Sequence, residues 1–315
     1  MVRKCYNHQI KIILFDKTGT ITKGHPEVRE IYSKVKTNYL MEVATSLENL
    51  SEHPIAKAIV SYSNLKKFKE VKKFRIIRGK CIEGEINRKK IFIGNRTLMK
   101  ENNISIKEIE SKLIEFESKA YTTMIVSENK KPIGIIGVAD DVKEDSISAI
   151  NYLNKQGYKT VMITGDNELT AKVIAKRTGI KQVISQVLPE EKANKVKELQ
   201  NRAMVCFVGD GINDAPALKQ ANVGIAMGTG TDIAIEAGDI VLARGNIRGV
   251  VASINLSKAT FSKIKQNLFW AFAYNVIMIP LAVAGIIHPV LAEIAMAASS
   301  ITVVTNANLL RRKRI

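Results

Sequence analysis

The stretch Lys11-Ile-Ile-Leu-Phe15-Asp16-Lys17-Thr18-Gly19-Thr20 decides the fold of this 315-residue chain. A short apolar run ends at a carboxylate and a glycine follows, which is the pattern of a buried strand that enters a polar loop. Residues 159–166 (KTVMITGD) and 203–214 (AMVCFVGDGIND) repeat this pattern. In a doubly wound α/β sheet the carboxyl ends of the strands meet at one edge, where ligands bind. We therefore expect these three loops to form a single site.

The composition excludes several classes of protein. With 46% hydrophobic residues, the chain is too apolar to be disordered. Three widely spaced cysteines, Cys5, Cys81 and Cys206, argue against a disulfide framework or a Cys-x-x-Cys metal site and suit a reducing compartment. The net charge of +18 leaves two readings open, a nucleic-acid binder or a membrane protein with positively charged cytosolic flanks.

The region between the first strand and the later ones has a different character. It is rich in Lys and Glu and contains strand-like pieces such as residues 90–94. Few aromatic residues interleave with its basic residues, so a solvated surface is favoured over a nucleic-acid site, and no nucleic-acid partner is expected. We interpret it as an α+β domain, residues 29–131, inserted into an α/β domain formed by residues 8–28 and 132–250.

Two apolar stretches in residues 251–315 predict a transmembrane hairpin. Residues 268–287 carry no charge, and residues 290–310 carry one. About 20 helical residues cross a hydrocarbon core of roughly 30 Å. Basic residues flank the outer ends but not the connecting turn, so a multi-pass protein of the cell membrane is expected, with its soluble domains and both termini in the cytoplasm. The alternative is a buried hairpin of a soluble domain.

The loop residues favour phosphoryl transfer. A carboxylate placed like Asp16 can attack phosphorus and form an acyl phosphate. Such chemistry needs Mg²⁺, which prefers hard oxygen ligands of the kind that Asp210 and Asp214 supply. Thr164 can hydrogen-bond a phosphoryl oxygen, and Lys192 can supply a fixed positive charge. Each residue alone is a weak signal, but their order after successive strands makes the set a strong one.

The motifs DKTGT (16–20), TGD (164–166) and GDGINDAP (209–216) resemble the signatures of P-type ATPases, whose phosphorylation domain has a haloacid-dehalogenase-like fold. The resemblance implies that Asp16 is phosphorylated by ATP with Mg²⁺ as cofactor. It implies that Mg²⁺ binds Asp16, Asp210 and the Thr18 carbonyl. The full catalytic set that it implies is Asp16, Lys17, Thr18, Thr164, Asp166, Lys192, Asp210, Asn213 and Asp214.

The sequence Ser51-Glu52-His53-Pro54, followed by an Ala-rich helical pattern, is similar to the nucleotide-binding motif of the heavy-metal subgroup of these pumps. A lone histidine is more often structural, but this one can stack on adenine. The subgroup's glycine pair aligns with residues 79–82, where Cys81 replaces the second glycine and places a side chain where the backbone would approach ATP. The ATP contacts that the resemblance implies are Glu52, His53, Gly79, Ile82, Asn95, Thr164, Gly165 and Asp166.

The two apolar stretches also resemble the last two membrane helices of copper(I) pumps. The matching patterns are Asn267, Tyr274-Asn275 and Pro280 in the first, and Met296-Ala-Ala-Ser299-Ser300 with Asn306 in the second. Soft Cu⁺ favours sulfur ligands, and a membrane site needs polar groups inside the bundle. The resemblance implies Cu⁺ as the transported ion. The alternative is that these residues only pack helices together. The Cu⁺ ligands implied are Tyr274, Asn275, Met296 and Ser299.

The resemblance covers only the C-terminal half of such a pump, and neither Cys-Pro-Cys nor Thr-Gly-Glu occurs in the chain. Three interpretations follow. The chain is a truncated or split copper(I)-transporting P-type ATPase, whose N-terminal half is then a possible separate partner. It is a membrane-tethered phosphatase of the haloacid-dehalogenase type, or it is a non-catalytic remnant. Lys17 and Thr18 favour the first over the second, because such phosphatases usually carry a second Asp where Thr18 stands.

Overall fold

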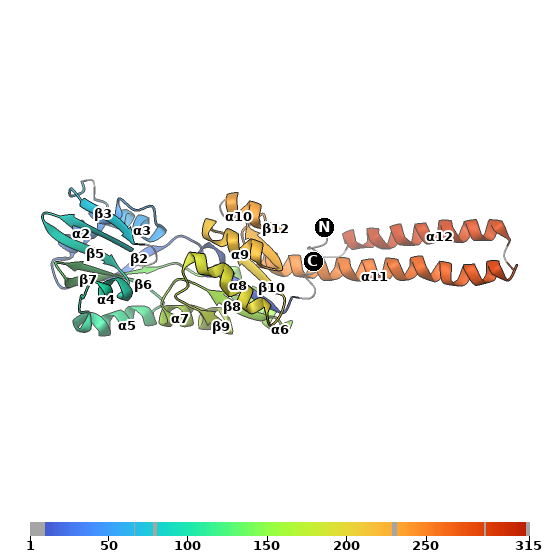
Figure 1. The fold of residues 1–315 in the computed structure, drawn as a ribbon, viewed down its shortest axis with the longest axis horizontal. Coiled ribbons are helices and arrows are strands. Elements are labelled where there is room, and N and C mark those ends of the chain that lie inside the picture. The colour runs from blue at the N-terminus through green and yellow to red at the C-terminus, as the bar shows by residue number, and fades with distance from the viewer. Residues whose placement is uncertain (1–9, 66, 78–80, 229–231, 287, 313–315) are drawn as a thin grey trace. The chain divides into compact units, whose positions relative to one another are not determined.

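The computed structural model describes residues 10–312 except 66, 78–80, 229–231 and 287. The chain forms two compact units, one of Lys11–Arg248 and one of Met1–Ile10 with Gly249–Ile315. The first unit contains two six-stranded sheets, and the second contains two long helices (Figure 1).

The first sheet is parallel, with strand order β12-β11-β10-β1-β8-β9. Every residue of β1 is buried, because helices cover both faces of the sheet, and this explains why its strands read as continuous apolar runs. The doubly wound α/β fold is confirmed. The strands are β1 (Ile12–Asp16), β8 (Lys159–Ile163), β9 (Gln182–Ile184), β10 (Val205–Gly209), β11 (Val223–Met227) and β12 (Ile240–Leu242). The helices are α6 (Glu144–Lys155), α7 (Glu168–Thr178), α8 (Lys192–Gln200), α9 (Ala215–Gln220) and α10 (Asp232–Ala237).

The second sheet is antiparallel, with order β2-β7-β6-β5-β4-β3. Alternate residues of β5 enter two separate cores: Ile91 and Ile93 pack with α2 and α3, and Phe92 packs with α4 and α5. The strands are β2 (Glu27–Ser33), β3 (Lys72–Ile77), β4 (Cys81–Ile86), β5 (Lys89–Gly94), β6 (Thr122–Glu128) and β7 (Lys131–Ala139). The helices are α2 (Thr37–Glu48), α3 (Pro54–Ser63), α4 (Arg96–Glu101) and α5 (Glu110–Ser118).

The sheet topology crosses the predicted domain boundaries at residues 28 and 131. Strands β2 and β7 pair with each other, and both belong to the antiparallel sheet. The apolar run of β7 resembles a parallel strand buried between helices. It has that composition because the antiparallel sheet is also covered on both faces.

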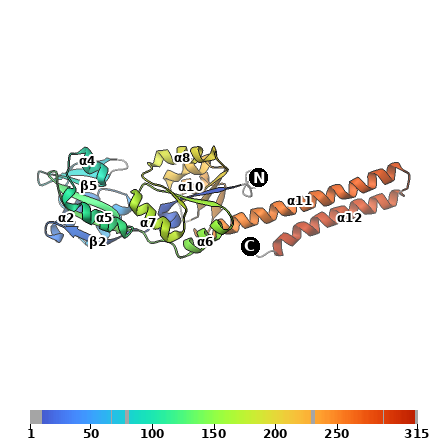
Figure 2. The same ribbon diagram turned by 90° about the horizontal axis from the view of Figure 1, so that it is seen from below.

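The second unit is a helical hairpin of α11 (Arg248–Val283) and α12 (Pro289–Asn308), which run antiparallel (Figure 2). By length and composition α11 is long and apolar enough to cross a membrane, and none of its most apolar window is buried. This helix begins 20 residues before the predicted span, since the apolar pattern marks the part suited to lipid rather than the start of the helix. The helices are joined by Asn306, whose side chain donates to Asn267 at 2.7 Å and accepts from Lys263 at 2.6 Å.

Candidate active site

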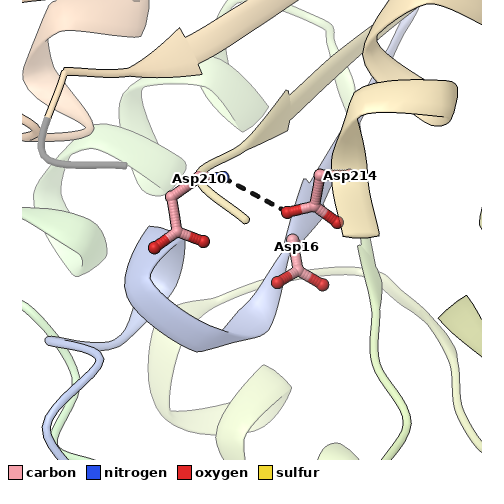
Figure 3. A group of neighbouring side chains, drawn as sticks. All are labelled: Asp16, Asp210 and Asp214. Carbon is pink, nitrogen blue, oxygen red and sulfur yellow. Dashed lines mark hydrogen bonds between the residues drawn. The ribbon is translucent and has the colours of Figure 1, made fainter. Parts of the chain in front are cut away.

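Three carboxylates meet at the carboxyl edge of the parallel sheet (Figure 3). Asp16 is the last residue of β1, Asp210 directly follows β10, and Asp214 ends the short turn Ile212–Asp214. One carboxylate oxygen of each lies within 4.8 Å of the others. Asp16 and Asp214 are buried, at 6% and 1% exposure. Two of the three loops predicted to form one site, those after β1 and β10, therefore meet here.

Lys192, at the first position of α8, joins two of these carboxylates. Its buried Nζ lies 2.6 Å from Asp16 Oδ1 and 2.7 Å from Asp214 Oδ1. The second oxygen of Asp214 accepts from the backbone N–H groups of Asp210 and Gly211, each at 3.2 Å. Asp214 therefore holds both the lysine and the loop that carries Asp210.

The site has more negative than positive charge. Burial and the charge of Asp214 raise the pKa of Asp16 to about 6, although Lys192 acts in the opposite direction. Burial, Asp16 and Asp214 raise the pKa of Asp210 to about 7. Burial lowers the pKa of Lys192, but the two carboxylates outweigh it and hold that pKa above its ordinary value. Three carboxylates around one ammonium provide the hard, anionic environment that a divalent cation prefers.

A glycine makes room for the Asp210 side chain. Gly19 has φ +70°, and a Cβ atom there would lie 1.7 Å from Asp210 Oδ2. The carboxylate thus packs directly on the Gly19 backbone, in a conformation that L-residues with a side chain rarely adopt. Oxygen donors converge beside a backbone cradle, so the residues present fit Mg²⁺.

A second ion pair ties the TGD loop to the DKTGT loop. Lys17 Nζ lies 2.5 Å from Asp166 Oδ2. Burial by itself lowers the pKa of Lys17, but the Asp166 carboxylate has the larger effect, so the pKa is raised above its ordinary value. Thr122 on β6 donates to Asp166 Oδ1 at 3.1 Å, and Thr164 Oγ1 accepts from the Asp166 N–H at 3.1 Å. Within the predicted catalytic set, Thr18 and Asn213 are exposed, and Gly165 of the TGD loop is exposed as well.

The predicted ATP contacts are used in different ways. His53 caps α3, with Nδ1 accepting from the Ile55 N–H at 3.2 Å, and burial and the charge of Lys17 lower its pKa. Asn95 caps α4, with Oδ1 accepting from the Leu98 N–H at 3.0 Å.

The other predicted ATP contacts that the structure describes cap no helix. Glu52 is exposed. Ile82 is 2% exposed and its side chain packs in the core beneath α2 and α3. Gly79 lies outside the described residues.

The predicted Cu⁺ ligands lie along the hairpin. Tyr274 and Ser299 are half-buried, while Asn275 and Met296 are exposed. The Asn275 side chain donates to the Ala271 carbonyl at 2.9 Å. Among the described residues of α11 and α12, no hydrogen bond links Tyr274 or Asn275 to Met296 or Ser299.

Three further residues stand out that were not predicted. Glu48, at the end of α2, is 3% exposed, its Oε1 has no hydrogen-bond partner, and burial raises its pKa to about 8. Asp140 and Lys143 follow β7 and bond to the loop after Asp16. The sequence does contain a signal for Asp140 and Lys143. An acidic pair, Asp140-Asp141, follows the apolar run of β7, just as Asp16 follows the apolar run of β1.

The comparison with protein families defines the class first. The profile of the haloacid dehalogenase-like hydrolases matches residues 10–222. The chain belongs to this family. A copper-exporting P-type ATPase of Staphylococcus saprophyticus is 44% identical over 311 residues, which are 98% of this chain and 39% of that protein. A copper-exporting P-type ATPase of Staphylococcus haemolyticus is 46% identical over 311 residues, with the same two coverages. The chain thus spans about two fifths of the length of these relatives.

Solved structures show which group of haloacid dehalogenase-like hydrolases this chain resembles. A zinc-transporting PIB-type ATPase in its E2.Pi state superposes with a TM-score of 0.70 at 33% identity, over 98% of this chain and 51% of that one. The catalytic domain of the CPx-ATPase CopB-B superposes with a TM-score of 0.63 at 32% identity, over 82% of this chain and 92% of that one. Within the haloacid dehalogenase-like hydrolases, the chain belongs to the P-type ATPases. The resemblance drawn from the three motifs is confirmed.

Proposed function

We propose that this chain is the ATP-hydrolysing and phosphorylated part of a copper(I)-transporting P-type ATPase, with Asp16 as the residue that receives the phosphoryl group. The observation that carries the proposal is the buried Asp16–Lys192–Asp214 arrangement with Asp210 beside it. A carboxylate at a strand end, held by a fixed cation, is arranged for nucleophilic attack on phosphorus.

The proposed reaction balances on this chain's own residues. The bond from Lys192 engages Asp16 Oδ1, and we assign the attack to the other oxygen, Oδ2. The new bond joins Oδ2 to the γ-phosphorus of ATP, while the bond from that phosphorus to the bridging oxygen breaks and ADP leaves with the electron pair. Lys192 neutralises charge on the phosphoryl oxygens, and Thr164 hydrogen-bonds them. Mg²⁺ bound by Asp16, Asp210 and the Thr18 carbonyl supplies further charge neutralisation.

The antiparallel-sheet domain supplies the proposed nucleotide site. Because His53 accepts a hydrogen bond at Nδ1, its neutral ring carries the proton on Nε2, and its lowered pKa favours that neutral form. A neutral ring suits stacking on adenine. Glu48 lies five residues earlier in the sequence, and a buried carboxyl oxygen without a partner, as its Oε1 is, is unfavourable unless a ligand satisfies it. We add Glu48 to the proposed contacts.

The hairpin supports the copper assignment through its register. The Asn267–Asn306 contact fixes which residues of the two helices lie level with each other. Tyr274 comes seven residues after Asn267 on α11, and Ser299 comes seven residues before Asn306 on α12. Seven residues are about two helical turns, so Tyr274 and Ser299 lie level with each other and on the same faces as the Asn267–Asn306 pair. Both are half-buried. Met296 precedes Ser299 by three residues and Asn275 follows Tyr274, and their sulfur and oxygen complete a donor set suited to Cu⁺.

The test is labelling of the full chain in detergent with ATP carrying a labelled γ-phosphate and Mg²⁺. We expect an acid-stable, hydroxylamine-sensitive phosphoprotein, with labelling lost by at least about 1,000-fold in Asp16→Asn, because that change removes the nucleophile. Asp232→Asn, an exposed carboxylate on α10, is the matched control and should label normally. Rapid phosphate release without accumulated label would instead support the tethered phosphatase, and absence of label would refute both enzymes.

A second arm of the same experiment concerns the ion. Cu⁺ binding to the solubilised chain is measured by competition with a chromophoric Cu⁺ chelator. Met296→Ala should weaken binding by at least about tenfold, because it removes the sulfur donor. Val304→Ala, at another exposed apolar position of α12, is the control. Equal affinity in both variants would contradict the copper site and leave the phosphorylation result unaffected.

A further inference from the structure

Residues 140–146, which connect β7 to α6 and include the first three residues of that helix, bond to the loop that follows Asp16. Thr22 Oγ1 donates to Asp140 Oδ2 at 2.6 Å. The Ile21 carbonyl accepts from the Lys143 N–H at 3.0 Å and from Ser146 Oγ at 2.8 Å. None of the three signature motifs includes this segment, yet its bonds determine where the loop after Asp16 lies.

The Lys143 side chain bonds to two distant parts of the chain. Its half-buried Nζ donates to the Gly19 carbonyl at 2.5 Å and to the Gly245 carbonyl at 2.8 Å. These two carbonyls belong to chain segments that are more than 200 residues apart in sequence. One ammonium group thus holds the loop after Asp16 and the segment just before α11 together. Both bonds are to backbone atoms, so they fix the path of the main chain.

The Gly19 peptide is the surface on which Asp210 rests. A Cβ at Gly19 would lie 1.7, 2.5 and 2.9 Å from the three terminal atoms of the Asp210 carboxylate. Any shift of Gly19 toward Asp210 therefore displaces the carboxylate, and any shift away removes its support. Lys143 holds the carbonyl of this same residue, so its bond acts on Asp210 through one intervening backbone unit.

The segment has a second attachment to the region before α11. Asp145 Oδ2 accepts from the Arg248 N–H, the first of α11, at 2.9 Å. Together with the Lys143–Gly245 bond, this joins residues 143–145 to residues 245–248 at two points. The Gly19 peptide is thus held against a firmly attached segment.

We propose that Lys143 is a positioning residue for the phosphorylation of Asp16: it fixes the Gly19 peptide, and thereby the Asp210 carboxylate, against the segment that leads into α11. The inference rests on the proposed function. It assigns Lys143 no contact with ATP or with the phosphoryl group. Removing its ammonium therefore slows the phosphoryl transfer and leaves nucleotide binding unchanged.

The test compares Lys143→Met, Lys143→Arg and the control Lys155→Met, an exposed lysine at the end of α6. Labelling of Asp16 by ATP should be slower by about 10- to 100-fold in Lys143→Met, the range expected when a catalytic group is misplaced by about 1 Å. Affinity for a fluorescent ATP analogue without Mg²⁺ should be unchanged. Lys143→Arg keeps donors for both carbonyls and should recover most of the rate, and Lys155→Met should match the unmodified chain.

Amide hydrogen exchange separates this inference from the proposed function. In Lys143→Met, exchange should rise in the peptides that contain residues 17–24 and 243–248 and stay unchanged in those of α3 and β5, whether or not Asp16 is ever labelled. If amide exchange in Lys143→Met equals that in the control Lys155→Met, or if Lys143→Met is labelled at the normal rate, the proposal is overturned. A general rise in exchange with weakened nucleotide binding would show a merely structural role and would overturn it as well.

Discussion

The two sheets of the first unit use their motif residues in opposite ways. At the edge of the parallel sheet, the bonds join residues far apart in sequence, such as Lys192 to Asp16 across 176 positions. In the antiparallel-sheet domain, His53 and Asn95 bond to backbone N–H groups only two and three residues away. The proposed phosphorylation site is thus assembled by tertiary contacts, whereas the proposed nucleotide contacts His53 and Asn95 cap the N-termini of helices.

This difference determines how each region responds to substitution. A residue that joins distant segments leaves buried charges unpaired when it is removed, so both stability and chemistry are affected at once. A residue that caps a helix makes a modest local contribution, so the effects on stability and on ligand binding can be separated. Substitutions at Lys192, Glu48 and His53 test this difference between the two regions.

The largest effect is expected for Lys192→Met. This change leaves Asp16 and Asp214 buried without their shared cation, and loss of one partner of such a buried arrangement costs about 3–5 kcal/mol. Urea unfolding of the full chain in detergent measures this, together with labelling, which should be abolished. The double variant Lys192→Met/Asp214→Asn should recover part of the stability. Unfolding free energies equal to that of the unmodified chain would show that the lysine is not a tertiary link.

An intermediate effect is expected for Glu48→Gln, and it depends on pH. Burial raises the pKa of Glu48 from 4.5 to about 8. Between these values the folded chain holds a proton that the unfolded chain has lost, so stability falls as pH rises from about 5 to 8. The variant lacks this dependence and should gain on the order of 2 kcal/mol relative to the unmodified chain over that window. Urea unfolding at pH 5, 6.5 and 8 measures the difference, and Glu236→Gln, exposed on α10, should show none.

The smallest effect on stability is expected at His53. His53→Ala removes both the cap of α3 and the ring, and the lost cap costs about 1 kcal/mol. His53→Ser keeps a capping oxygen and should unfold like the unmodified chain. Both variants should weaken binding of a fluorescent ATP analogue to the same degree, because both lack the ring. If His53→Ser binds the analogue normally, the residue is only a cap.

The sequence predicted the parts of the site that depend on a general rule of topology. Asp16, Asp210 and the TGD loop each follow an apolar run, and the ends of parallel strands must meet at one edge. Lys192 was identified from the resemblance and from its position at a helix start. The structure joins it to two carboxylates that lie 176 and 22 residues away.

Other features depend on which face or which sheet a residue enters, and local sequence does not fix that. Ile82 was predicted as an ATP contact, but alternation along β4 turns its side chain into the core. Lys143 lies in an ordinary polar loop, and its role as proposed depends on bonds to the carbonyls of Gly19 and Gly245, which are distant from it in sequence. Glu48 reads as the polar end of an amphipathic helix, and its burial comes from the packing of the whole domain.

The continuity of α11 has a mechanical consequence. Residues 248–267 precede the apolar span and form about 30 Å of uninterrupted helix, since its one internal proline, Pro280, comes later. Such a rod amplifies rotation: a tilt of about 10° at its first turn displaces its far end by about 5 Å. The first residue of this rod, Arg248, is held by its bond to Asp145, so the Asp145 carboxylate fixes the point from which any such tilt is measured.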